Sequence, residues 1–210
     1  MDKTVVEQAV REALKKVQGD HEQIKVGVSQ RHIHLSREDL DTLFGTGYEL
    51  TKKKTLMGRE FASEECVTLV GPSLKSIERV RVLGPVRAKT QVEISRTDTF
   101  ILKVSPPVRP SGQIEGSERL VVVGPKGSVY LKEGVIIANR HIHLTPEYAK
   151  QHNIADGDYV DVMVESIKPT KFYGVQVRVR DDFNIEMHID TDDANSAGLR
   201  NGDIVRIIKK

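Results

Sequence analysis

The chain has 210 residues, of which 38% are hydrophobic, 30% charged and 5% aromatic, and it contains no tryptophan. This composition is typical of a globular protein with one or two domains, and it excludes the fibrous, disordered and membrane-spanning classes. The 32 basic and 30 acidic residues leave a net charge of +2, so we expect no general attraction to nucleic acid, and any anionic ligand must be held locally.

The amino-terminal segment 1–23 is predicted to contain an amphipathic helix. Thr4 and Glu7 have the spacing of a capping box, and Gly19 can end the helix. The apolar side chains recur at spacings of three and four, which places them in one stripe: Val5, Val6, Ala9, Val10, Ala13, Leu14 and Val17. Two interpretations stay open, a helix that packs on its own domain or on a dimer mate, and a helix that targets or docks the protein elsewhere.

From Ile24 onward the sequence predicts mostly strands. Short runs rich in Val and Ile alternate with Gly, Pro, Asn and Asp, and they cover residues 67–70, 80–83, 92–95, 120–123, 135–138, 159–164, 175–179, 185–189 and 204–208. Short helices, each opened by a residue that can cap it, are predicted at 36–44, 145–152 and 192–197. The pattern is typical of a barrel or a sandwich, so the expected class is mainly β with small helices.

The sequence also repeats itself. Residues 31–36 read RHIHLS, and residues 140–145, about half the chain later, read RHIHLT. Downstream of the two copies, Glu93 and His188 fall on matching predicted strands. The chain is therefore predicted to be duplicated.

The duplication suggests a division of the chain. The stretch 105–112 is rich in Pro and Gly, forms helices and strands poorly, and makes a natural connector. We expect four segments: the amino-terminal helix at 1–23, a first repeat at 24–105, a connector at 106–116 and a second repeat at 117–210.

The repeated His-x-His pairs carry the strongest chemical signal. Residues i and i+2 of a strand project from one face, so His32 with His34, and His141 with His143, can each offer two imidazoles to one metal ion. A single pair could equally make cross-strand hydrogen bonds. Two copies in a duplicated frame favour metal binding.

The matching strands can supply a third ligand to each pair. Glu93 would complete a His₂Glu set and His188 a His₃ set, which leaves an open position on a tetrahedral zinc ion and makes one ion more electrophilic than the other. Iron, cobalt or manganese would accept the same ligands. Each third residue also has an interpretation without metal. Glu93 could be an exposed strand carboxylate that pairs with Arg96, and His188 could be a core histidine whose hydrogen bonds are satisfied by its neighbours.

The single cysteine, Cys66, excludes an internal disulfide and a cysteine-rich zinc site. No histidine lies near it in the sequence, so packing within a strand is favoured, while a nucleophilic role stays open. No signal peptide opens the chain, and we expect a cytoplasmic location.

Four segments, residues 26–36, 83–98, 139–144 and 186–192, closely resemble the phosphate propanoyltransferases, the phosphotransacylases of propanediol-utilisation type. The resemblance covers nearly the whole chain. It implies two tandem β-barrel domains, two zinc or other divalent transition-metal ions per subunit, and reversible transfer of a propanoyl or acetyl group between coenzyme A and phosphate. A homodimer is also expected.

The resemblance also implies roles for individual residues. The first metal would be bound by His32, His34 and Glu93, and the second by His141, His143 and His188. Arg87 matches the family's phosphate-binding arginine. Contacts to coenzyme A are matched by Val28, Ser29, Gln30, Arg81 and Asn195. Lys75 matches a further basic contact, although this sequence carries an extra residue at 73–75.

The chemistry of the residues agrees with these roles. Attack of phosphate on a thioester builds an oxyanion and brings two anions together, so it needs an electrophile and cations, which open metals and Arg87 would provide. Lys75 and Arg81, beside the Gly71-Pro72 turn, could bind the phosphates of coenzyme A or form a solvated basic edge. Direct phosphate attack is favoured over an acyl-cysteine intermediate.

Two other classes of function use the same residues. A metal-dependent thioester or amide hydrolase would need no phosphate, and a non-enzymatic barrel module would need neither open metal positions nor Arg87. In the resembled family, members inside bacterial microcompartments carry a short amphipathic helix that docks them to shell or cargo. Residues 1–18 could play that part here.

Overall fold

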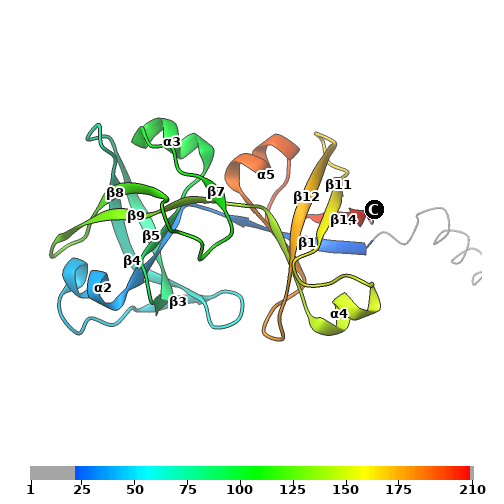
Figure 1. The fold of residues 1–210 in the computed structure, drawn as a ribbon, viewed down its shortest axis with the longest axis horizontal. Helices are drawn as coiled ribbons and strands as arrows, with labels where there is room; N and C mark the ends of the chain where they lie inside the picture. Colours follow the sequence, from blue (N-terminus) through cyan, green and yellow to red (C-terminus); the bar gives the residue numbers. More distant parts are fainter. Residues whose placement is uncertain (1–21, 209–210) are drawn as a thin grey trace, which may run out of the picture.

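The computed structural model describes residues 22–208, and they form two β-barrels side by side with four short helices around them (Figure 1). The predicted class, mainly β with two barrels and short helices, is confirmed. The predicted amino-terminal helix lies outside the described residues, apart from Glu22 and Gln23, which begin a strand. Within the described part of the chain no helix is long and apolar enough to cross a membrane.

The first barrel closes by pairing in the order β4-β5-β2-β6-β9-β8 and back to β4. Its strands are β2 (His32–Ser36), β4 (Phe61–Val70), β5 (Ser76–Arg87), β6 (Gln91–Glu93), β8 (Glu118–Val123) and β9 (Ser128–Ala138). Two short strands extend its sheet, β3 (Lys52–Thr55) beside β4 and β7 (Val108–Arg109) beside β9. Its helices are α2 (Arg37–Phe44) and α3 (Arg96–Leu102).

The second barrel closes in the order β1-β13-β10-β12-β11-β14. Its strands are β1 (Glu22–Ser29), β10 (His141–Leu144), β11 (Tyr159–Val164), β12 (Thr170–Val179), β13 (Glu186–Asp190) and β14 (Ile204–Ile208). Its helices are α4 (Pro146–Gln151) and α5 (Thr191–Ala197).

The two halves of the chain exchange their first strands. β1 precedes the first His-x-His strand but pairs with β13 and β14 of the second barrel. β9 precedes the second His-x-His strand but pairs with β6 and β8 of the first barrel. The division of strands between the barrels therefore differs from the predicted repeats at 24–105 and 117–210. Long-range strand pairing, and not the order of strands along the chain, decides which barrel a strand completes.

The chain thus crosses between the barrels directly before each His-x-His pair. Residues 30–31 join β1 to β2, and residues 139–140 join β9 to β10. The isoleucine within each pair, Ile33 or Ile142, is fully buried in its barrel core, as the alternation of a strand requires. Each pair of histidines is therefore fixed at a barrel wall next to the junction of the two barrels.

Every described helix begins at a residue whose side-chain oxygen accepts a hydrogen bond from a backbone N–H of the first turn, at Ser36, Ser95, Thr145 and Asp190. Two further contacts repeat between the halves. Arg31 pairs with Asp98 of α3, and Arg140 pairs with Asp193 of α5. These pairs tie each crossing segment to the helix that follows the third predicted ligand.

Candidate metal centre

The structure brings together the three residues predicted for the first metal. Strands β2 and β6 pair with His32 directly opposite Glu93, and one ligand atom from each of His32, His34 and Glu93 lies within 4.8 Å of the others. The His32 Nε2 atom is 3.5 Å from Glu93 Oε2. All three side chains lie on the face of the sheet that the i, i+2 rule predicts.

Hydrogen bonding prepares these imidazoles to act as ligands. His32 Nδ1 donates to the backbone carbonyl of Gln30 at 2.8 Å, which leaves Nε2, 3.5 Å from Glu93 Oε2, as the ring nitrogen that faces the triad. His34 Nδ1 is buried and has no hydrogen-bond partner. Burial, followed by the charges of His32 and Arg87, lowers the pKa of His34 to about 2, so this ring is neutral at pH 7, as a metal ligand must be.

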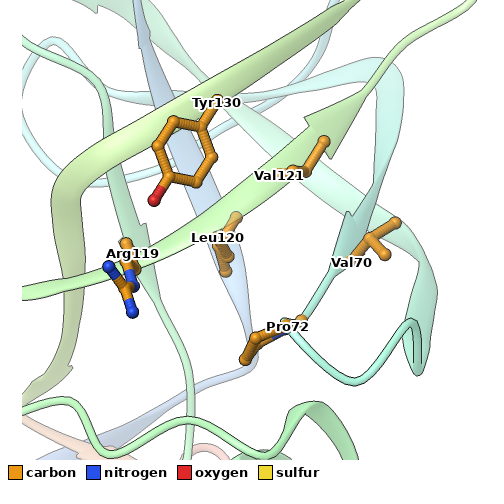
Figure 2. Close-up of a pocket in the computed structure, with 7 residues that line it drawn as sticks. Val70, Pro72, Arg119, Leu120, Val121 and Tyr130 are labelled. Atoms are coloured by element: carbon orange, nitrogen blue, oxygen red, sulfur yellow. The ribbon is translucent and has the colours of Figure 1, made fainter.

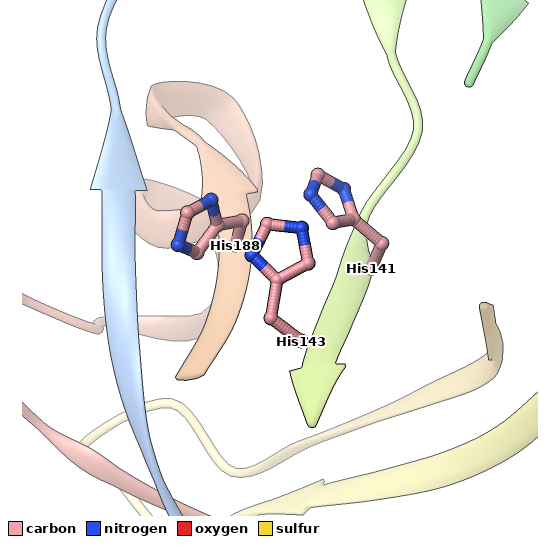
Figure 3. Close-up of side chains that lie close together, drawn as sticks. All are labelled: His141, His143 and His188. Carbon is pink, nitrogen blue, oxygen red and sulfur yellow. The ribbon is translucent and has the colours of Figure 1, made fainter. Parts of the chain in front are cut away.

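The second triad repeats this geometry with three histidines. His141 on β10 lies directly opposite His188 on β13, and one nitrogen from each of His141, His143 and His188 lies within 4.8 Å of the others. The ring centroids are 4.6 Å apart for His141 and His143, 4.6 Å for His143 and His188, and 5.3 Å for His141 and His188. Figure 3 shows the three rings converging from the two strands.

The neighbours of the second triad orient its rings. His141 Nδ1 donates to the Asn139 carbonyl at 2.9 Å, the counterpart of the bond from His32 to Gln30. The His143 ring stacks on Phe183 at 3.9 Å, and its Nδ1 lies 2.9 Å from the Met57 sulfur. Burial is the main cause that lowers the pKa of His141 to about 4 and that of His143 to about 2, so both rings are neutral at pH 7.

A carboxylate stands behind the third ligand of this triad. His188 Nε2 donates to Glu186 Oε2 at 3.0 Å. Gly27 of β1 lies directly opposite His188, and a Cβ atom there would approach Glu186 Cδ to 3.0 Å and His188 Cδ2 to 3.2 Å. Glycine at this position leaves room for the pair.

The two triads are electrostatic neighbours across the junction of the barrels. Burial raises the pKa of Glu93, but the charge of His32, the Ser111 hydroxyl, the Arg87 guanidinium and His141 of the second triad outweigh it, and the pKa is below its ordinary value. Glu93 is therefore ionised at pH 7 and is affected by both triads.

Arg87 lies beside the first triad, where its charge acts on His34. Its Nη2 donates to Glu60 Oε1 at 2.6 Å and its Nη1 to Ser111 Oγ at 3.2 Å. Ser111 Oγ also accepts from Gln91 Nε2 at 2.7 Å, and Gln91 donates to Glu93 Oε1 at 2.6 Å. A short network of side chains therefore connects the guanidinium to the third ligand of the first triad.

The residues predicted to contact coenzyme A fall into separate places. Val28, Ser29 and Gln30 form the end of β1 and the crossing to β2, and Val28 pairs with β13, which leads into α5 and the exposed Asn195. Arg81 lies opposite His32 in the sheet. Its guanidinium, however, donates to backbone carbonyls of β4, those of Ser63 at 3.0 Å and Glu64 at 2.8 Å.

Lys75 lies at a different place in the first barrel. It follows the turn between β4 and β5, where its carbonyl accepts from the N–H of Gly71, and it precedes Arg81 by six residues. A shallow recess opens beside this turn and is lined by Val70, Gly71, Pro72, Arg119, Leu120, Val121 and Tyr130 (Figure 2). No residue of either triad lines it.

Cys66 belongs to neither triad. It is half-buried in β4, with its sulfur 4.0 Å from the Glu64 carbonyl oxygen. This placement agrees with the packing role favoured by the sequence.

Several residues of the site were not identified from the sequence. Glu186 and Gln91 each precede a third ligand by two residues, so the i, i+2 rule was a signal for both. Met57, Phe183 and Arg178 reach the second triad from segments distant in sequence, and Glu60 and Ser111 reach Arg87 in the same way. No local sequence pattern marks these five residues.

Comparisons with known proteins give a consistent result. The family model described as phosphate propanoyltransferase matches residues 25–200. The phosphate propanoyltransferase of Lachnoclostridium phytofermentans is 54% identical over 185 residues, which cover 88% of this chain and 87% of the relative. That of Thermotoga maritima is 55% identical over 188 residues, 89% of each chain, and that of Priestia megaterium is 47% identical over 207 residues, 97% of this chain and 95% of the relative.

Proposed function

Because the chain belongs to the phosphate propanoyltransferase family, we propose that it transfers a propanoyl or acetyl group reversibly between coenzyme A and phosphate at a site with two metal ions. The observation that carries this proposal is the placement of two triads of ligand side chains at one junction, with Arg87 beside the first. The reaction needs an electrophile for the thioester carbonyl and a cation for phosphate, and the two triads with bound metal and Arg87 would provide them.

The side chains of both triads fit a divalent transition metal such as zinc. Imidazole nitrogen and carboxylate oxygen are suitable donors, and the lowered pKa values of His34, His141 and His143 keep these rings in the neutral form that binds metal. The Nδ1 atom of His34 is buried without a hydrogen-bond partner, which costs folding free energy. A metal ion bound by this nitrogen would offset that cost. When bound, the ions would act as Lewis acids toward the thioester carbonyl.

In the proposed reaction Arg87 binds phosphate through its planar guanidinium. Two of its nitrogens donate to oxygens, one of Glu60 and one of Ser111, which supports a role in which the guanidinium donates to two phosphate oxygens. Phosphate would replace the Glu60 carboxylate, a partner that is 42% exposed. Ser111 would keep Arg87 aligned with the Glu93 side of the site.

The transfer step forms one bond and breaks another. An oxygen of hydrogen phosphate forms a bond to the carbonyl carbon of the thioester, the carbon–sulfur bond breaks, and coenzyme A leaves as its thiolate, which takes up the proton that the phosphate carried. The products are acyl phosphate and coenzyme A, and the reverse reaction uses the same contacts. Two oxygens of the phosphate held by Arg87 would leave a third free to attack.

For coenzyme A we propose the contacts that the resemblance implies: Val28, Ser29, Gln30, Arg81, Asn195 and Lys75. The segment 28–30 adjoins His32, so we assign it to the end of the cofactor nearest the thioester. Lys75 lies at the far turn and is assigned to a phosphate group distant from the reacting carbon.

The experiment that tests this function measures release of the coenzyme A thiol from propanoyl- and acetyl-coenzyme A with and without phosphate. We expect release to depend on phosphate and to yield one acyl phosphate, trapped as its hydroxamate, for each thiol. A metal-dependent hydrolase would release thiol equally well without phosphate. That result would contradict the proposal.

Arg87→Ala tests the phosphate contact within the same assay. We expect turnover at limiting phosphate to fall at least about 100-fold, because a bidentate charged contact is lost, while both metals stay bound. The matched control is Arg200→Ala, which removes an exposed arginine of the second barrel. Wild-type turnover in the Arg87→Ala protein would show that the assignment is wrong.

We further propose that the protein acts as a cytoplasmic homodimer and that residues 1–18 are an address for a bacterial microcompartment rather than part of the catalytic machinery. The sequence of this segment has a full apolar stripe and none of the proposed ligands. Deleting it should leave turnover within a few-fold of the full chain, and light scattering gives the subunit number. Diffuse fluorescence of a fusion in a compartment-forming cell would contradict the targeting role.

A further inference from the structure

Arg178, near the end of β12, is a charged side chain at the junction for which neither the sequence nor the proposed function provides a role. It lies directly opposite His143 in the parallel pair of β10 and β12. The side chain is half-buried, and its Nη2 group is buried without a hydrogen-bond partner. An unpartnered guanidinium nitrogen in a partly dry site indicates a missing acceptor.

The charges around Arg178 come from both triads. Its positive charge acts on His141 and His143 of the second triad, and the Glu93 carboxylate of the first triad acts on it. Asp156 acts on it as well, and one Asp156 oxygen accepts from the Val179 N–H at 2.8 Å. Arg178 is thus electrostatically coupled to side chains on both sides of the junction.

Arg180, two residues after Arg178, is a nearby arginine whose guanidinium has partners within the protein. Its Nη2 donates to Asp182 at 2.9 Å, and its guanidinium lies 4.9 Å from the centroid of the Phe183 ring. Arg180 is exposed, whereas Arg178 is half-buried and keeps an unused donor. Of these two arginines, Arg178 alone has a buried donor without a partner.

Among the described residues, the carboxylates of Glu93 and Asp156 act on Arg178 through their charge, but neither accepts a hydrogen bond from its Nη2 group. The Glu93 carboxylate already accepts from Gln91 and faces His32. Cations bound in the two triads would repel the guanidinium of Arg178, and an anion between the triads would offset that repulsion. The chemistry of the site thus calls for an additional anion, and the reaction under the proposed function supplies one.

We propose that Arg178 is a second phosphate-binding residue, which holds the transferred phosphate from the second barrel while Arg87 holds it from the first. This inference rests on the proposed function. Both arginines act electrostatically on Glu93, one from β5 and one from β12, so a phosphate near Glu93 lies within the field of both. Two planar forks fix the orientation of a phosphate better than one, and they stabilise the charge that passes between phosphate and thioester.

The test compares Arg178→Gln and Arg178→Lys with Arg180→Gln, a matched control in the same segment, all in the full chain as purified with its metals. Three quantities are measured: metal content, the affinity for inorganic phosphate by calorimetry, and the KM values for phosphate and for propanoyl-coenzyme A. We expect Arg178→Gln to weaken phosphate binding and raise its KM at least tenfold, with KM for propanoyl-coenzyme A changed less than twofold. Arg178→Lys should lose less, and Arg180→Gln should match the wild type.

Phosphate affinity within twofold of the wild type in Arg178→Gln would overturn the inference, as would a rise in KM for propanoyl-coenzyme A alone. If Arg178→Gln loses metal or unfolds, Arg178→Lys decides, because it keeps the charge: loss of metal there too would assign Arg178 a structural role and overturn the inference. A wild-type protein that neither binds phosphate nor needs it would overturn the proposed function, and with it this role for Arg178.

Discussion

The two triads occupy equivalent positions in their barrels but differ in where the carboxylate stands. In the first, Gln91 pairs with the second histidine of the strand and Glu93 is the third ligand side chain. In the second, Glu186 takes the place of the glutamine and His188 the place of the glutamate. The carboxylate has therefore shifted by two residues, from the ligand position to the position beside it.

This shift shows how one fold can make two different sites. The first set of ligands carries a negative charge, so the same divalent ion would be one charge unit less positive there than in the second set. The Glu186 carboxylate instead accepts from His188, where it can raise the basicity of that ring. We infer that the second site is the stronger electrophile and that the first, with Arg87 beside it, is the phosphate side.

Removing two histidines from either triad should have the largest effect. We expect His141→Ala/His143→Ala and His32→Ala/His34→Ala each to bind one equivalent of metal instead of two, and each to lose at least about 1,000-fold in turnover, since a Lewis acid contributes several kcal/mol. Elemental analysis of the purified proteins checks the stoichiometry. Retention of both ions in either variant would show that the triad concerned does not bind metal.

Glu186→Gln tests whether the shifted carboxylate supports the second site. The amide cannot hold His188 as the carboxylate does, and we expect a loss of about 10–100-fold in metal affinity at the second site only. Competition with a chelating dye measures it, and Glu147→Gln, an exposed substitution in α4, is the control. An equal loss of metal affinity at both sites would show that Glu186 does not support the second site alone.

Acid should destabilise the metal-free protein, and more through the second triad than the first. The pKa values of His141 and His143, about 4 and about 2, and of His34, about 2, lie below the ordinary 6.5 because of burial. As the pH falls below 6.5 the unfolded chain binds protons that the folded chain does not, so the stability present above that pH is lost down to about pH 4 for His141 and about pH 2 for His143 and His34.

The loss should be about 2 kcal/mol for each of these histidines between pH 7 and pH 5. Urea unfolding of chelated protein at the two pH values measures it. His141→Gln/His143→Gln should flatten the pH dependence about twice as much as His34→Gln. A pH dependence unchanged in all variants would mean that these rings are not held neutral.

The smallest expected effect concerns the partner of Arg87 in the first site. Glu60→Gln removes the carboxylate that pairs with Arg87, so phosphate no longer competes with a charged group, and we expect KM for phosphate to fall about threefold. Steady-state kinetics at fixed propanoyl-coenzyme A measures it. A higher KM would show that Glu60 helps to hold Arg87 in place for phosphate.

The triads could be predicted from the sequence because they rest on local rules. The i, i+2 alternation places His32 with His34 and His141 with His143, and the internal repeat points to Glu93 and His188. Helices α2, α4 and α5 begin and end within one residue of the predicted bounds, because their caps are explicit. The strands at 159–164 and 204–208 coincide with β11 and β14.

Other features depend on contacts that no local pattern encodes. Helix α3 was not predicted, since two threonines and an isoleucine among its seven residues are weak helix formers, although Ser95 and Asp98 form a capping box. The exchange of β1 and β9 is decided by pairing between distant strands. Arg178 and Met57 reach the second triad only after the barrels close.

The most direct test of the account is reconstitution of chelated protein with counted equivalents of zinc, with phosphate-dependent release of coenzyme A as the readout. We expect transfer to rise to its maximum at two equivalents per chain in the wild type, and we expect neither double histidine variant to recover it at any zinc level. Full phosphate-dependent transfer in the metal-free protein, or saturation at one equivalent, would contradict a reaction that uses both triads.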